Sequence, residues 1–102
     1  MYKMVFRTLT NPLGFNGQAD YEIKTDNKMY RTSSHPNGYS FKPDYVIKED
    51  NKVYRTQSHP KGYSGMPDYE IHEDLKLYRS KTNAYGPSTL LDYEIREVHT
   101  QQ

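Results

Sequence analysis

The chain has 102 residues, which is enough for one small domain, and a net charge of +1. It has no cysteine, which excludes disulfides, thiolate metal sites and a cysteine nucleophile. The sequence has no block of basic residues of the kind that binds duplex nucleic acid. No apolar run approaches the ~20 residues of a membrane span, and the start lacks the apolar stretch of a secretory signal. We therefore expect a soluble cytoplasmic protein that does not enter a membrane. Eleven tyrosines argue against disorder, because each can bury a ring while its hydroxyl stays paired or hydrated.

A 24-residue repeat organises the chain. "DYEI" begins at residue 20, "DYVI" at 44, and "DYEI" again at 68 and 92, and the first two units share 17 of 24 residues. We divide the single repeat domain 1–102 into a half-unit 1–19, whole units 20–43, 44–67 and 68–91, and a half-unit 92–102. A chain that starts and stops in mid-unit can pair its N- and C-terminal strands, whereas an open solenoid needs capping repeats.

Each unit has the pattern of one β-hairpin. Tyr21 and Ile23 alternate with charged residues, and "KMYRT" follows as a return strand. Asp26 and Asn27 between them predict a tight two-residue turn. Leu75, at the position of Asn27, does not fit this turn chemistry.

A two-residue turn fixes the register of each hairpin. It predicts Ile23 opposite Tyr30 on a buried face, and Glu22 opposite Arg31 on a solvated one. The same register places Glu70 opposite Arg79 and, across the chain ends, Glu94 opposite Arg7 and Ile95 opposite Phe6. The expected fold is all-β: four hairpins closing into a pseudo-fourfold ring, as a small eight-stranded barrel or as four two-stranded blades.

The connections between hairpins are about eleven residues long and share the pattern of "SSHPNGYSFKP". The first interpretation is structural: polar side chains bond to the backbone, Pro and Gly turn the chain, and the aromatic packs the loop down. The second is a ligand-binding rim, because aromatic rings offer stacking area and polar groups give orientation. The candidate ligand-binding residues are Asn11, Phe15, His35, Tyr39, His59, Tyr63 and Asn83.

A second surface is defined by an arginine that every unit keeps. Interleaved with tyrosine, these arginines would suit single-stranded nucleic acid, although cross-strand pairing with glutamate is the stronger interpretation. The four are Arg7, Arg31, Arg55 and Arg79.

No set of residues indicates catalysis, a metal or a cofactor. Two histidines 24 residues apart are too few for a zinc site, and no acidic residue has a fixed place beside the Ser-His pairs. We expect a non-enzymatic binding or interaction protein that holds a carbohydrate or another small polar molecule at the loop rim. The alternatives are a single-stranded nucleic-acid binder, and a structural protein that forms homo-oligomers or contacts a protein partner.

Overall fold

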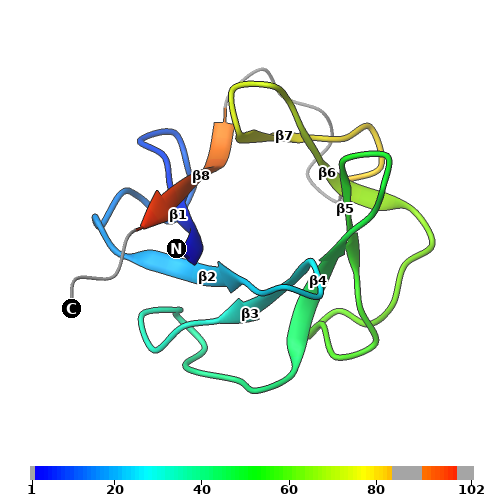
Figure 1. Cartoon of the computed structure of the whole chain (residues 1–102), viewed down its shortest axis with the longest axis horizontal. Helices are drawn as coiled ribbons and strands as arrows, with labels where there is room; N and C mark the ends of the chain where they lie inside the picture. Colours follow the sequence, from blue (N-terminus) through cyan, green and yellow to red (C-terminus); the bar gives the residue numbers. More distant parts are fainter. Residues whose placement is uncertain (1, 84–90, 99–102) are drawn as a thin grey trace.

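A computed structural model describes residues 2–83 and 91–98 and shows eight strands in one closed antiparallel barrel (Figure 1). The strands are β1 Tyr2–Arg7, β2 Ala19–Ile23, β3 Lys28–Arg31, β4 Pro43–Ile47, β5 Lys52–Arg55, β6 Pro67–Ile71, β7 Lys76–Arg79 and β8 Leu91–Val98. Every strand pairs with its neighbours in the chain, and β1 pairs with β8. The predicted all-β ring of hairpins is confirmed, and it is a barrel rather than a set of separate blades. Among the described residues no helix could cross a membrane.

The predicted register of the hairpins is wrong by one residue. Asn27 has a φ of 59°, and its N–H donates to the carbonyl of Lys24, while the N–H of Lys24 donates to the carbonyl of Lys28. The loop therefore has three residues and ends in a left-handed position, a common hairpin type with a bulge, instead of two residues. Ile23 consequently lies opposite Met29 and not opposite Tyr30.

The other predicted pairs shift in the same way. Phe6 lies opposite Glu94, and Arg7 lies opposite Tyr93. The predicted Glu–Arg pairs do not form, and the pairs that replace them are Tyr21 with Arg31, Glu22 with Tyr30, Tyr69 with Arg79, Glu70 with Tyr78, and Val5 with Ile95.

A one-residue shift moves every side chain of the return strand to the opposite face. Met29 is buried, whereas Tyr30, which we expected in the core, lies outside. Its hydroxyl donates to Asp26 at 2.5 Å, and Lys24 Nζ lies 4.4 Å from the centre of its ring. This hydrogen bond lowers the pKa of Asp26. The hydroxyl of Tyr30 therefore stabilises the turn through Asp26. Tyr54 and Tyr78 make the same hydrogen bond to an aspartate in their own turns.

The core is built in layers, each supplied by alternate strands, as in other small barrels. One layer holds the isoleucines of the even-numbered strands, the next holds Val5, Met29, Val53 and Leu77, and the third holds Tyr21, Tyr45, Tyr69 and Tyr93. The four tyrosine rings meet edge to face around the barrel, with centroids 5.8–6.1 Å apart. Such pairs add about 0.5–1.5 kcal/mol each beyond the area they bury.

The antiparallel topology gives the barrel two different ends. At the end that we call the hairpin end lie the three tight turns, residues 24–28, 48–52 and 72–76, together with the outer ends of β1 and β8. At the opposite end, the loop end, long connections leave the barrel over residues 8–18, 32–42 and 56–66, and a fourth begins at residue 80 and is described as far as residue 83. The two ends hold different candidate sites.

Candidate functional site

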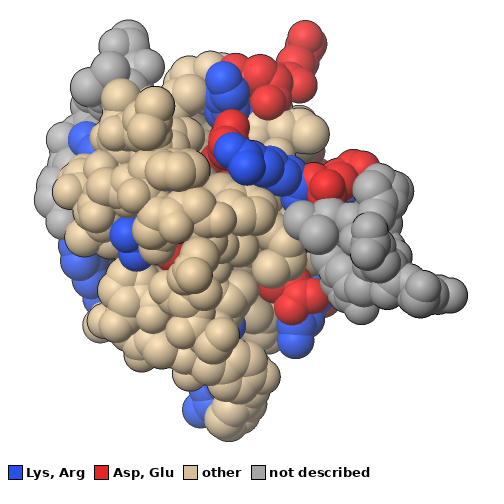
Figure 2. All heavy atoms as spheres, turned by 90° about the vertical axis from the view of Figure 1, so that its left-hand side faces the viewer, with Lys and Arg blue, Asp and Glu red and all other residues tan. Residues whose placement is uncertain are grey.

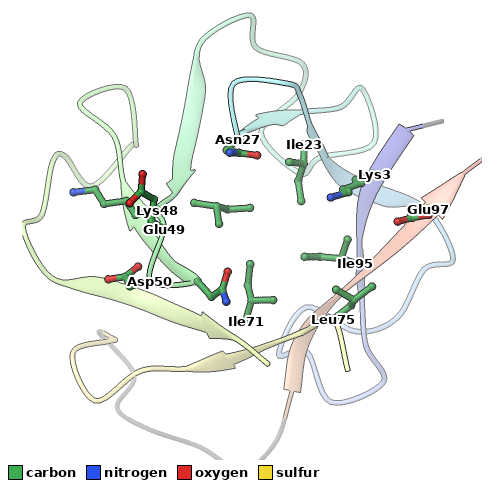
Figure 3. Close-up of a pocket in the computed structure, with 12 residues that line it drawn as sticks. Lys3, Ile23, Asn27, Lys48, Glu49, Asp50, Ile71, Leu75, Ile95 and Glu97 are labelled. Atoms are coloured by element: carbon green, nitrogen blue, oxygen red, sulfur yellow. The ribbon is translucent and has the colours of Figure 1, made fainter. Parts of the chain in front are cut away.

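A cavity of about 800 Å³ opens at the hairpin end. Four isoleucines line its apolar part, one from each even-numbered strand: Ile23, Ile47, Ile71 and Ile95. Figure 3 shows Ile23, Ile71 and Ile95 converging on its centre from three sides. These four are all the isoleucines of the chain. The volume lies within the range of about 300–1,000 Å³ that is typical of sites for small ligands.

Charged residues line this cavity on two opposite sides. Lys3 and Glu97 come from the two strands that close the barrel, and Lys48, Glu49 and Asp50 come from the turn between β4 and β5 (Figure 3). Charges of both signs can orient a polar group of a ligand, while the isoleucines accept an apolar body. The chemistry of the cavity is therefore amphipathic.

Three turn residues with positive φ stand beside the cavity: Asn27, Asn51 and Leu75, with φ of 59°, 60° and 59°. Their carbonyls accept a hydrogen bond of 2.8 Å from the backbone N–H of Ile47, Ile71 and Ile95, so each turn is tied to the next hairpin. Leu75 takes the same conformation as the two asparagines, although a leucine is less stable there.

Leu75 differs from the asparagines in what it presents to solvent. Its side chain is 45% exposed and lines the cavity, so little packing compensates for its backbone conformation. A residue that breaks a local rule beside a cavity is a candidate for function. Leu75 adds apolar surface to the cavity wall at one of the three turns, where the other two turns have asparagine.

At the loop end, the repeated "HPxG" string forms a turn. The N–H of Gly62 donates to the carbonyl of His59 at 2.8 Å, and Gly62 has a φ of 83°, which favours glycine. Pro60 occupies the second position of this turn, where its fixed φ is suitable. The same turn recurs at His35–Gly38. The string thus forms the turn that the first interpretation expected, but that interpretation was wrong about the aromatic, because Tyr39 and Tyr63 are exposed and do not pack the loop down.

Both predicted histidines have their two ring nitrogens engaged. His59 Nδ1 accepts from the N–H of Lys61 at 3.0 Å, and Nε2 lies 3.1 Å from the hydroxyl of Tyr45. His35 makes the same two contacts, with Asn37 and Tyr21. Since Nδ1 accepts, the neutral ring carries its proton on Nε2 and donates it to the tyrosine. Burial lowers the pKa of both histidines.

Asparagine occupies the position of these histidines in the other two units. Asn11 Nδ2 donates to the carbonyl of Asp92 at 2.8 Å, and its side-chain oxygen accepts from the N–H of Leu13. Asn83 Nδ2 donates to the carbonyl of Asp68 at 2.9 Å. Both asparagines are buried. The four equivalent positions therefore tie the loops to the barrel.

The structure brings together only part of the predicted rim. A hollow of about 300 Å³ at the loop end is lined by His35, His59 and Asn83, beside the rings of Tyr21, Tyr45 and Tyr69. Asn11, Phe15, Tyr39 and Tyr63 do not line this hollow, and the three aromatics among them are exposed. Ligand binding by these residues stays a prediction.

The four arginines of the predicted nucleic-acid surface are paired with aspartates and are largely shielded from solvent. Arg7, Arg31, Arg55 and Arg79 each bond through Nε to an aspartate on the next strand, at 2.8–2.9 Å: Asp20, Asp44, Asp68 and Asp92. The arginine side chains are only 9–15% exposed. They point inward because the register differs by one residue from the expected one. Arg7 is buried and the other three are part-buried, with Arg55 lining the loop-end hollow, so nucleic-acid binding through these arginines stays a prediction.

In the part of the chain that the structure describes, no three histidine or acidic side chains gather as metal ligands. The cavity residues were recognised from sequence only as core, in the case of Ile23, or as an atypical turn, in the case of Leu75. The signals that could have found the cavity are that every isoleucine recurs at one position of the repeat and that a leucine stands where two units have asparagine. Comparisons with protein-family models, curated proteins and solved structures gave no match.

Proposed function

We propose that this chain is a non-enzymatic binding protein that holds a small amphipathic molecule in the hairpin-end cavity. The observation that carries the proposal is a cavity of about 800 Å³ on whose centre all four isoleucines of the chain converge. Well-formed, mainly apolar concavities with a few polar groups are the usual sites for small ligands.

The lining favours an apolar ligand body over a sugar. A carbohydrate needs hydrogen-bonding groups on several sides and is commonly stacked on an aromatic ring. The cavity offers isoleucine and leucine instead, and Lys3 points a cationic group toward it (Figure 3). A ligand with an aliphatic or aromatic body and one acidic group matches this arrangement.

The test is calorimetric titration with 1-anilinonaphthalene-8-sulfonate, an apolar ring system that carries one anion. Ile71→Phe adds volume inside the cavity, and we expect it to weaken saturable one-site binding about tenfold or more, since displacing a well-packed ligand costs a few kcal/mol. His59→Asn is the matched control, because asparagine stands at that position in two other units.

The control should bind the probe like the wild type. Circular dichroism and thermal melts verify that both variants are folded, because the probe also binds molten states. Equal affinity of all three proteins would contradict the proposal, and so would the absence of saturable binding.

A second candidate is a small polar ligand at the loop end, favoured by the hollow of about 300 Å³ that His35, His59 and Asn83 line. It requires the ligand to replace the bonds between histidine and tyrosine. The same two variants separate the candidates: binding of a methyl glycoside that is weakened by His59→Asn and not by Ile71→Phe would place the site at the loop end.

A further inference from the structure

Exposed hydrophobic side chains are concentrated at the loop end. Eight large hydrophobic residues are exposed among those the structure describes, and only Leu75 belongs to the hairpin end. The other seven lie in three long connections and are 49–84% exposed: Leu9, Leu13, Phe15, Tyr39, Phe41, Tyr63 and Met66. Scattered exposed hydrophobic residues are ordinary, but a concentration at one end of a small domain indicates an interaction surface.

The long connections also differ from the rest of the chain in charge. Their sequences, residues 8–18, 32–42, 56–66 and 80–90, contain Lys42, Lys61 and Lys81 and no aspartate or glutamate. The aspartates nearest to them are buried against the arginines. The acidic side chains visible in Figure 2 gather mainly in the upper and right parts of that face, and the lower left is largely uncharged or basic.

From this combination we propose that the loop end docks on an anionic lipid surface. Leu, Phe, Tyr and Met side chains would enter the boundary between headgroups and acyl chains, and the lysines would lie near the headgroup charges. A peripheral contact of this kind needs no membrane-spanning helix, and none of the described residues form one. It differs from the expectation that the protein avoids membranes, which rested on the lack of an apolar run.

Two observations favour lipid over the other anionic partner, single-stranded nucleic acid. Three of the seven exposed side chains, Leu9, Leu13 and Met66, are aliphatic and give a base nothing to stack on. The four repeated arginines are held in ion pairs with buried aspartates, and their side chains are only 9–15% exposed, which leaves little of them to contact phosphates. Aliphatic side chains with lysine are instead typical of membrane-surface segments.

Four of the seven exposed side chains argue against a protein partner held in a groove, whereas Leu9 and Phe15 line a third hollow, of about 510 Å³. Tyr39, Phe41, Tyr63 and Met66 line neither the hairpin-end cavity nor the loop-end hollow. They project from two separate connections, where a specific protein interface would need a contiguous packed centre. A fluid lipid interface accepts separate projections. The hairpin-end cavity lies at the opposite end of the barrel and would stay open to water, so this proposal is independent of the proposed function.

The test is co-sedimentation with phosphatidylcholine vesicles that contain either no or about 30% phosphatidylserine. We expect binding only to the anionic vesicles, and loss of that binding as NaCl rises from about 0.05 to about 0.5 M. The double variant Tyr39→Ser/Phe41→Ser should reduce the bound fraction about fivefold or more, because it removes two projecting aromatics. Lys42→Glu should also reduce it.

Leu75→Ser is the matched control, since it removes the exposed hydrophobic residue of the other end and should bind vesicles like the wild type. The proposal is overturned if anionic vesicles do not bind the protein, or if Leu75→Ser lowers binding as much as the loop variant does. It is also overturned if a labelled single-stranded oligonucleotide binds while vesicles do not, which would identify nucleic acid as the partner. Thermal melts of each variant exclude unfolding as the cause of a loss.

Discussion

The two ends of the barrel are made by the same four repeats and yet have opposite characters. At the hairpin end, one isoleucine from each unit points toward the barrel axis, and the four together line one cavity. At the loop end, histidine and asparagine anchor the connections to the barrel, and the hydrophobic residues project outward. Side chains near the axis converge into a shared site, whereas side chains in long connections diverge. A repeat can therefore build one shared cavity at one end of the barrel and several separate projections at the other.

The two ends also differ in where the units depart from one another. The buried Arg–Asp pairs and the tyrosine ring recur in all four units. Beside the cavity, Leu75 replaces asparagine, and the cavity thereby becomes asymmetric. Changes to this common frame should affect both ends of the barrel, whereas changes to the residues that distinguish the ends should affect one end.

Deletion of residues 1–7 should have the largest effect, because it removes the strand that pairs with both β2 and β8. Both ends of the barrel would open, and we expect an unfolded chain by circular dichroism and amide NMR. A circular permutant that joins the original termini with a short linker and begins at Lys52 keeps all eight strands and should fold. A cooperative urea transition in the deleted chain would contradict the closed ring.

Arg55→Leu should destabilise the protein by about 3–5 kcal/mol, because it leaves Asp68 buried without its partner 2.8 Å away. Arg96→Leu is the control for an arginine lost from an exposed ion pair with Glu94, and should cost at most about 1 kcal/mol. Urea unfolding of both variants measures the difference. Equal and small costs would mean that the buried pairs do not stabilise the frame.

Lowering the pH should reduce the free energy of unfolding through His35 and His59, which anchor two of the long connections. Their pKa values in the folded protein lie below the value of about 6.5 expected in the unfolded chain, so the unfolded chain takes up protons first as the pH falls. Their contribution to stability is complete above about pH 6.5 and is lost as the pH falls toward the folded pKa. The double variant His35→Asn/His59→Asn should therefore show a flatter dependence of unfolding free energy on pH in this window. An unchanged slope would mean that these rings do not titrate with folding.

Leu75→Asn should stabilise the protein by about 1 kcal/mol, because asparagine tolerates positive φ better than leucine does. The reciprocal Asn51→Leu should destabilise it by a similar amount. In the same experiments, Leu75→Asn should weaken binding of the anilinonaphthalene probe a few-fold, since it shortens the apolar wall of the cavity. Greater stability without any loss of binding would show that Leu75 is merely a poor turn residue.

The repeat itself made much of the fold predictable. Its period gave the hairpins, and the offset of the ends gave the pairing of β1 with β8. The turn type was the weak step, because Asp26-Asn27 fits both a two-residue turn and a three-residue loop that ends at Asn27. That one-residue difference reversed the face of the return strand, exposing Tyr30 and burying the arginines.

The candidate site was harder to predict. A motif such as "SHPKGYS" combines the residue types of a site, but the same types also close turns and anchor loops. His59 does the latter, through Lys61 and Tyr45. The cavity is formed by hydrophobic residues that look like any core positions in sequence, and their convergence depends on barrel closure and register.

Because the chain contains only four isoleucines, and all four line the cavity, methyl NMR shows whether a ligand occupies the cavity. A protein labelled at its isoleucine δ1 methyls should give four signals. Titration with the anilinonaphthalene probe should shift them in a saturable way, with those of Ile71 and Ile95, which flank the turn of Leu75, among the largest. Saturable binding that leaves all four methyls unmoved and shifts the ring signals of His35 and His59 would contradict the account and place the ligand at the loop end.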